Sequence, residues 1–200
     1  MSLTADLARW QRRIRPEKRR APLGYRDRSA LPFFPAATLA GPVMLDTCAY
    51  IDALSGKMPL ALEALLPGRR HLHSTVCLAE LAFGLGAMKP DAAHAARSRS
   101  TLGDLFDRIE IKRTVSLPAS GWMAAGLIAG VLARLQGGSR AERRRFLADA
   151  AIYLSAQTAG ATLLTANWRD FDLIDQLAVD GQAGARLLCY TPEASHGGGP

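Results

Sequence analysis

The sequence predicts an α/β protein in which a parallel sheet is covered by helices on both faces. Short apolar runs alternate with longer helical patterns from Pro42 to Tyr190, as in proteins built from β-α-β units. These runs are continuously apolar, which is typical of strands buried on both faces. The chain has 200 residues, 48% of them hydrophobic. These figures suit one globular domain plus an appendage.

The appendage is a basic, partly helical extension over residues 1–40. An apolar stripe at helical spacing opens it, formed by Leu3, Leu7, Trp10 and Ile14, and four prolines follow that break a helix. Nine basic and three acidic residues fall between Met1 and Arg28, so this segment carries +6 of the net charge of +7. The high pI therefore describes the extension rather than the nearly neutral body. The helix either packs on the body or on a second copy, or it serves as an arm that binds RNA, DNA or a partner.

The body is predicted over residues 41–191, followed by a flexible tail at 192–200. Strands are expected at Val43–Leu45, His71–His73, Ile109–Ile111 with Val115, Thr162–Thr165 and Arg186–Tyr190. Helices are expected to begin near Tyr50 and to span Leu60–Leu66, Val76–Met88, Ala92–Arg108, Ala119–Gln136 and Ala141–Ala159. Ser74 or Thr75 should cap the helix that begins at Val76, and Gly160 should end the last of these helices.

Cysteine usage and hydropathy indicate a cytoplasmic protein without a membrane span. The three cysteines are far apart and include no C-x-x-C pair, so they are expected to be buried thiols in a reducing compartment. The most apolar run, Trp122–Leu135, contains Arg134 and is shorter than the ~20 residues that span a bilayer. No secretory signal pattern opens the chain.

Four acidic residues stand out because of their surroundings. Asp46 directly follows a predicted strand, and Asp170 lies soon after another. Parallel sheets place their sites at these strand ends. Glu80 and Asp149 each interrupt an apolar helical stretch, where a carboxylate is rare unless it is paired or binds a metal. Carboxylates that share a pocket repel one another, and an all-oxygen set favours magnesium or manganese over zinc.

Each acid also has an ordinary explanation. Asp46 or Thr47 could cap the following helix, and Glu80 could face solvent. Asp149 could pair with Arg145 one turn earlier. Asp170 could be a loop acid in the solvated run Arg169–Asp172.

The order of these acids and the local sequence around each of them resemble the PIN-domain nucleases, especially the VapC-type toxins of toxin–antitoxin systems. The resemblance is carried by the segments Val43–Thr47, Ser74–Gly84, Leu147–Ile152 and Leu163–Phe171. The last segment is the most specific, because it is close to the T-x-N-x-x-D-F ending of that family. Two departures from the family pattern are the long basic arm before Pro42 and the basic stretch Ser139–Arg145.

The resemblance implies a three-layer α/β/α sandwich with a central parallel sheet and a metal-dependent endoribonuclease activity. The expected ligands of Mg²⁺ or Mn²⁺, and the catalytic residues, are Asp46, Glu80, Asp149 and Asp170. The supporting polar residues would be Thr47, Asn167 and Asp172, and a candidate RNA-backbone surface is formed by Arg140, Arg143, Arg144 and Arg145. That surface could equally be a solvated helix face with local salt bridges. The implied partners are an RNA substrate, a small antitoxin protein and a second copy of the chain.

Three alternatives remain at this level. The protein could be a housekeeping PIN nuclease in RNA processing or on DNA flaps. It could instead be a non-catalytic module that binds nucleic acid or a partner through the basic arm. A phosphatase of the aspartyl-phosphate type is disfavoured, because that chemistry commonly needs a second Asp two residues after the first, where this chain has Cys48.

Overall fold

The computed structural model describes residues 2–89, 95–137, 139–178 and 186–194. Its helices and strands in chain order are α1 (Leu3–Ile14), β1 (Val43–Leu45), α2 (Thr47–Leu54), α3 (Leu60–Glu63), β2 (His71–Ser74), α4 (Thr75–Ala87), α5 (Ala95–Arg108), β3 (Thr114–Val115), α6 (Ala119–Gln136), α7 (Arg140–Thr158), β4 (Thr162–Thr165), α8 (Trp168–Ala178) and β5 (Arg186–Cys189). The predicted helix start at Ala92 and the predicted flexible end of the tail, residues 195–200, lie outside the described residues.

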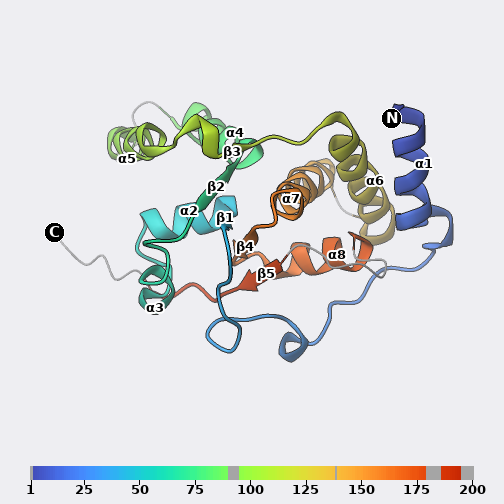
Figure 1. Ribbon diagram of the computed structural model, residues 1–200, viewed down its shortest axis with the longest axis horizontal. Helices are drawn as coiled ribbons and strands as arrows, with labels where there is room; N and C mark the ends of the chain where they lie inside the picture. The colour runs from blue at the N-terminus through green and yellow to red at the C-terminus, as the bar shows by residue number, and fades with distance from the viewer. Residues whose placement is uncertain (1, 90–94, 138, 179–185, 195–200) are drawn as a thin grey trace.

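The strands form one parallel sheet in the order β3-β2-β1-β4-β5. The chain winds outward from β1 in one direction and from β4 in the other, so these two central strands mark the point where the winding reverses. Right-handed crossovers then place the helices that follow β1 and β2 on one face and those that follow β3 and β4 on the other. In Figure 1, α6, α7 and α8 lie together on the right of the strands, α2 and α3 lie to the left, with α3 lower, and α4 and α5 lie above. The predicted α/β/α fold class is confirmed.

The helix boundaries follow local signals that were visible in the sequence. Ser74 is the N-cap of α4, where its hydroxyl accepts a hydrogen bond from the Val76 amide at 3.2 Å. Gly160 follows α7 with a positive φ of 62°, which glycine adopts at little cost. The side chains that fill the space between the layers are large and fully buried, including Tyr153, Phe171 and Leu163.

Helix α6 is apolar because it is covered on several sides. It packs against α7, α1 and α8, and Ile128 and Leu132 on it are fully buried. Within the part of the chain that the structure describes, no helix combines the length and apolarity needed to cross a membrane.

Two segments differ from the sequence-based expectation. The strand expected at Ile109–Ile111 is replaced by a 3-10 turn over Ile111–Arg113, and only Thr114–Val115 pairs with β2. Ile111 cannot serve as a core strand residue because its side chain is 87% exposed. Conversely, the segment after Asn167, expected as a loop, forms helix α8, whose Phe171, Ile174 and Leu177 are buried.

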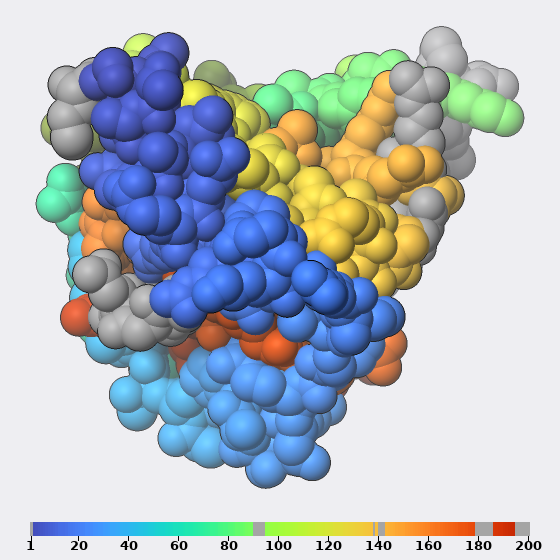
Figure 2. All heavy atoms as spheres, turned by 90° about the vertical axis from the view of Figure 1, so that its right-hand side faces the viewer, coloured from blue at the N-terminus to red at the C-terminus, as the bar shows by residue number. Residues whose placement is uncertain are grey.

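The N-terminal extension follows the body closely, and Figure 2 shows it in blue crossing one face of the molecule over the red α8 region. Helix α1 packs on α6 and α8, with Ile14 fully buried. Arg13 Nε donates to the Ala178 carbonyl at the C-terminal end of α8. Farther along the extension, Phe33 bridges to Cys189 on the outer strand β5. The extension therefore runs the length of α8 and covers the β5 edge of the sheet, which would otherwise be open to pairing.

Candidate active site

Asp46 occupies the carboxyl end of β1, beside the end of β4. Leu45 pairs with Leu164 in the sheet, which places the next residues, Asp46 and Thr165, side by side. Thr165 Oγ1 donates to Asp46 Oδ2 at 2.8 Å, and the Thr47 amide donates to Asp46 Oδ1 at 2.6 Å. Asp46 is both the N-cap of α2 and a buried carboxylate at the sheet's switch point, where open α/β sheets hold their ligands.

Glu80 reaches the same place from α4, on the next strand–helix unit. Thr47 Oγ1 donates to Glu80 Oε2 at 2.5 Å, so Thr47 links the start of α2 to the second acid. Glu80 is partly exposed, and it lines a pocket, so it is not simply a solvent-facing helix residue.

Asp149 and Asp170 approach from the opposite side, on α7 and α8, and Asn167 joins them. The Asn167 side-chain amide donates to Asp170 Oδ2 at 3.0 Å and to Asp149 Oδ2 at 3.5 Å. Arg145 does not pair with Asp149 in the way that the helical spacing allows. Its Nε pairs with Asp170 Oδ2 at 3.0 Å, which leaves Asp149 with the weak amide contact.

The charges of Asp46, Glu80 and Asp170 all act on the Asp149 carboxyl. Burial raises the pKa of Asp149 well above its usual value, and the charges of Asp46, Asp170 and Glu80 raise it further, with Arg145 opposing them. Burial also raises the pKa of Asp46. Hydrogen bonds from Cys48, Thr165 and Thr47 oppose that shift, and the charge of Glu80 adds to it. Mutual repulsion of this kind is what a bound divalent cation relieves.

The donor set fits a hard divalent cation in its chemistry, because every donor is an oxygen. Among the described residues, however, no three Asp, Glu, His or Cys side chains stand close enough together to form a preassembled metal site. The acids come from four places in the fold, and Asn167 and Arg145 contact the two on α7 and α8.

Two groups of sequence-predicted residues lie apart from this cluster. Asp172 is fully buried and faces the extension, where it binds the side chain and backbone amide of Arg26. It therefore anchors the extension and does not face the other acids. Arg143 and Arg144 are exposed on the first turns of α7, and Arg145 reaches the cluster through Asp170. The side chain of Arg140 lies outside the described residues.

Sequence reasoning assigned no role to Thr165 or Cys48, both of which contact Asp46. Cys48 Sγ donates to Asp46 Oδ2 at 2.9 Å. Burial and the Asp46 charge raise the pKa of this thiol, so it stays protonated and donates. Thr165 Oγ1 also accepts a hydrogen bond from the backbone N–H of Asn167 at 2.9 Å. The T-x-N pattern was the signal that could have identified Thr165.

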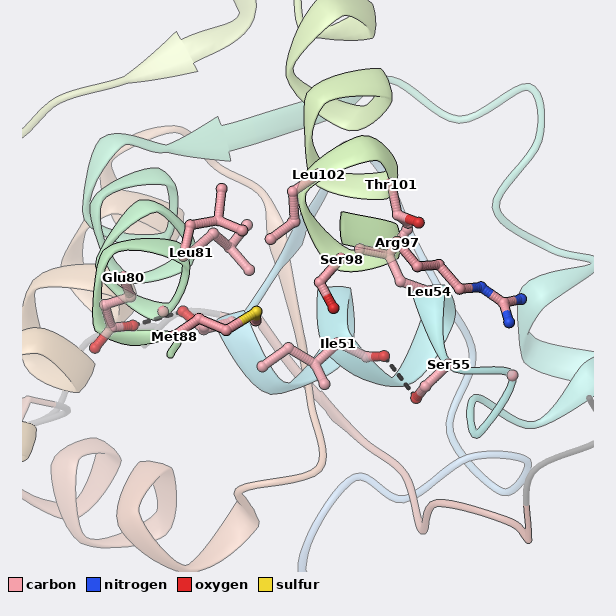
Figure 3. A pocket seen from close by; sticks show the side chains of 14 residues that line it. Ile51, Leu54, Ser55, Glu80, Leu81, Met88, Arg97, Ser98, Thr101 and Leu102 are labelled. Carbon is pink, nitrogen blue, oxygen red and sulfur yellow. Dashed lines mark hydrogen bonds between the residues drawn. The ribbon is translucent and has the colours of Figure 1, made fainter. Parts of the chain in front are cut away.

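A pocket of about 700 Å³ opens beside the acids, between α2, α4 and α5. Figure 3 shows Ile51 and Leu54 on one wall, Leu81 and Met88 on another, and Glu80 at one end. Ile51 and Leu54 are 52% and 42% exposed. The pocket thus combines partly uncovered apolar side chains with polar ones, and Glu80 is the acid of the four that lines it.

The parallel sheet in the order 3-2-1-4-5, with acids gathered at its switch point, is consistent with the PIN fold. Solved structures of that class are similar. A chain of the DNA-bound VapBC complex from Salmonella typhimurium matches with a TM-score of 0.50 and 22% identity, over 74% of this chain and 97% of that chain. A VapBC complex from Rickettsia felis bound to promoter DNA gives a TM-score of 0.49 and 23% identity over 74% and 97% of the two chains. FitAcB from Neisseria gonorrhoeae gives 0.46 and 16% over 74% and 96%.

No protein-family model and no curated protein sequence matches this chain. At such low identity the structural matches show the fold, and the motif resemblance is confirmed at that level.

Proposed function

We propose that this protein is a divalent-metal-dependent endoribonuclease, the toxin of a toxin–antitoxin pair. The feature that supports the chemistry most directly is the burial of the Asp149 carboxyl near three other carboxylates, which together raise its pKa. A fold gains no stability from burying like charges against one another. A site that binds a cation gains affinity from the same arrangement.

In this proposal Asp46, Glu80 and Asp149 hold Mg²⁺ or Mn²⁺, and Asp170 completes the set directly or through a water molecule. Bound there, the ion supplies an activated water and neutralises charge that develops on the scissile phosphate. Thr165 and the Thr47 amide fix the Asp46 carboxylate by donating to its two oxygens. Asn167 holds Asp149 and Asp170 as a pair. The exposed Arg143 and Arg144 are placed to contact RNA phosphates, which gives affinity without sequence choice.

The test compares RNA cleavage by the wild type, Asp46→Asn and Asp149→Asn in Mg²⁺ or Mn²⁺. We expect each variant to lose more than about 100-fold in rate, because even outer partners of a metal ligand typically cost 10- to 100-fold. Asp107→Asn, on the exposed side of α5, is the matched control and should cleave like the wild type. Full activity of either site variant, or of the wild type in excess EDTA, would refute the proposal.

The uncovered pocket beside Glu80 favours an inhibitory protein partner. Its apolar walls suit a segment that buries two or three apolar side chains, and an occupant would also block access to Glu80. Another structure with a similar fold, VapBC-5 from Mycobacterium tuberculosis, belongs to the VapBC family of toxin–antitoxin systems. We therefore propose that a small antitoxin occupies this pocket.

The partner proposal predicts growth arrest on expression of the chain alone, and rescue by a small protein encoded beside it. Leu54→Arg in the pocket should weaken rescue, because it buries an unpaired charge in the interface. Leu60→Arg, on an exposed leucine of α3 outside the pocket, should leave rescue intact. A housekeeping nuclease would cleave RNA without growth arrest, and a non-catalytic module would do neither.

A further inference from the structure

The N-terminal extension brings aromatic and cationic side chains to the first turn of α8. Tyr25 and Phe33 of the extension both contact Trp168, each with ring centroids 6.1 Å apart in an edge-on arrangement. Trp168 is the first residue of α8 and directly follows Asn167, which binds Asp149 and Asp170. Consecutive Cα atoms are ~3.8 Å apart, so the backbone of Trp168 lies next to the residue that contacts Asp149 and Asp170, while its ring contacts the extension.

Two guanidinium groups lie over these rings. The Arg169 guanidinium is 5.3 Å from the Trp168 ring centroid and 6.0 Å from that of Tyr25. The Arg28 guanidinium is 4.1 Å from the Phe33 ring centroid. Both arginines are exposed. Each of the three aromatic rings therefore has a guanidinium group within 6.0 Å of its centroid, which could attract a phosphate backbone that the carboxylates repel.

The Tyr25 ring is more exposed than fastening the extension requires. Its residue is 54% exposed, whereas Arg26 beside it binds the buried Asp172 and also Asp175, the latter at 2.7 Å. That pair already holds this part of the extension against α8. An exposed ring beside an exposed guanidinium is the usual arrangement for stacking an unpaired base, with the guanidinium available to the adjoining phosphate.

We propose that Tyr25, Trp168 and Arg169 form a subsite that stacks one unpaired base of a single-stranded RNA, at the end of α8 where Asn167 contacts two of the proposed catalytic carboxylates. The subsite rests on the proposed ribonuclease function and adds a determinant supplied by the extension. Stacking is tolerant of base identity, so the subsite selects unpaired over paired RNA rather than a sequence. Arg169 contributes affinity through the backbone phosphate.

The test measures binding without cleavage, by fluorescence anisotropy of a labelled eight-nucleotide single-stranded RNA on the full chain in EDTA. An abasic oligonucleotide of the same length keeps the phosphates and lacks the bases. We expect Tyr25→Leu to weaken binding of the base-containing RNA by about 5- to 100-fold, with binding of the abasic oligonucleotide unchanged. Tyr25→Phe keeps the ring and should bind as the wild type does.

Arg169→Gln should weaken binding of both oligonucleotides and lower the salt slope of binding by about 0.7. Wild-type binding by Tyr25→Leu, or an equal loss on both oligonucleotides, would overturn the subsite. A melting temperature within error of the wild type shows that each variant is folded. If Tyr25→Leu loses base-dependent binding while Asp46→Asn still cleaves RNA, the subsite stands and the proposed catalytic site fails. If Asp46→Asn is inactive and Tyr25→Leu binds normally, the reverse holds.

Discussion

Asp149 shows how a single residue can be costly for the fold and useful for the site. It is 5% exposed, and the side-chain contact described for it is the 3.5 Å amide of Asn167. A buried carboxylate normally has closer hydrogen-bond donors or an ion-pair partner. Arg145, which could have supplied the ion pair, binds Asp170 instead. Burial of the Asp149 carboxylate is therefore not offset by a close partner among the contacts described for it.

This arrangement sets the pH dependence of stability in the metal-free protein. Because the pKa of Asp149 is raised in the folded state by burial and by Asp46, Asp170 and Glu80, the folded protein holds this proton to higher pH than the unfolded chain does. Its contribution to stability is complete below the unfolded value of about 4 and is lost as pH rises through the raised pKa.

We therefore expect Asp149→Asn to melt at a higher temperature than the wild type at pH 8 in EDTA, and at a similar temperature near pH 4. For a chain of this length, each 1 kcal/mol gained should raise Tm by roughly 2–4 °C. Adding Mg²⁺ should stabilise the wild type more than the variant. Thermal denaturation monitored by circular dichroism measures both effects, with Asp107→Asn as the control. A less stable Asp149→Asn at pH 8 would show that the carboxylate is a structural group.

At the scale of single residues, the sequence identified the acids better than their partners. An acid inside an apolar stretch is visible without coordinates, and so is an acid directly after a strand. The partner of each acid depends on which elements meet in space. Asp172 has the same local appearance as Asp170, two residues earlier, but it lies on the side of α8 that faces Arg26. Its place in the site could not be judged until α8 was known to be a helix.

At the scale of elements, helix α8 accounts for most of what was missed. The run Trp168–Ala178 carries four charged residues and opens with the polar motif that marks the site, so its polar character dominated the pattern. Its apolar residues Phe171, Ile174 and Leu177 nevertheless have helical spacing. For the third strand the pattern was misleading in the opposite way, because it suggested a strand at Ile109–Ile111 whereas the residues that pair in the sheet are Thr114 and Val115. Ile109 and Ile111 have strand-like alternation, yet the chain at that point is an exposed 3-10 turn.

The central strands were predictable because burial on both faces leaves a short, wholly apolar run. β1 is Val43–Leu45, and all three of its residues are buried. The order of the strands, in contrast, depends on the direction in which each crossover returns to the sheet, and local residue preferences carry no information about that direction. The sequence therefore predicted a parallel sheet without its strand order. No pattern in the sequence predicted that the extension covers the β5 edge of the sheet.

At the scale of the whole molecule, the extension contributes to the fold as well as to the charge. Nearly all of the net charge resides there, which on its own suggests a solvated arm. In the structure Ile14 is fully buried in the main core, and Arg134 and Gln136 at the end of α6 donate to the carbonyls of Pro16, Arg19 and Leu23. Six of its nine basic residues are exposed, whereas Arg13 and Arg26 bind groups of α8, and the inner surface of the segment completes the core.

Removing residues 2–28 should therefore destabilise the protein as a whole. The deletion uncovers the α6 surface under Ile14 and leaves the buried Asp172 without Arg26. Losing a buried isoleucine alone typically costs about 2–5 kcal/mol, and an unpaired buried carboxylate adds to that cost. We expect Tm to fall by at least about 5 °C, with increased binding of a hydrophobic dye, measured by thermal denaturation and fluorescence. The triple variant Arg12→Gln, Lys18→Gln and Arg20→Gln removes only exposed charge and should melt like the wild type. An unchanged Tm in the deletion would show that the extension is an independent arm, and a large drop in the triple variant would show that its charges stabilise the fold.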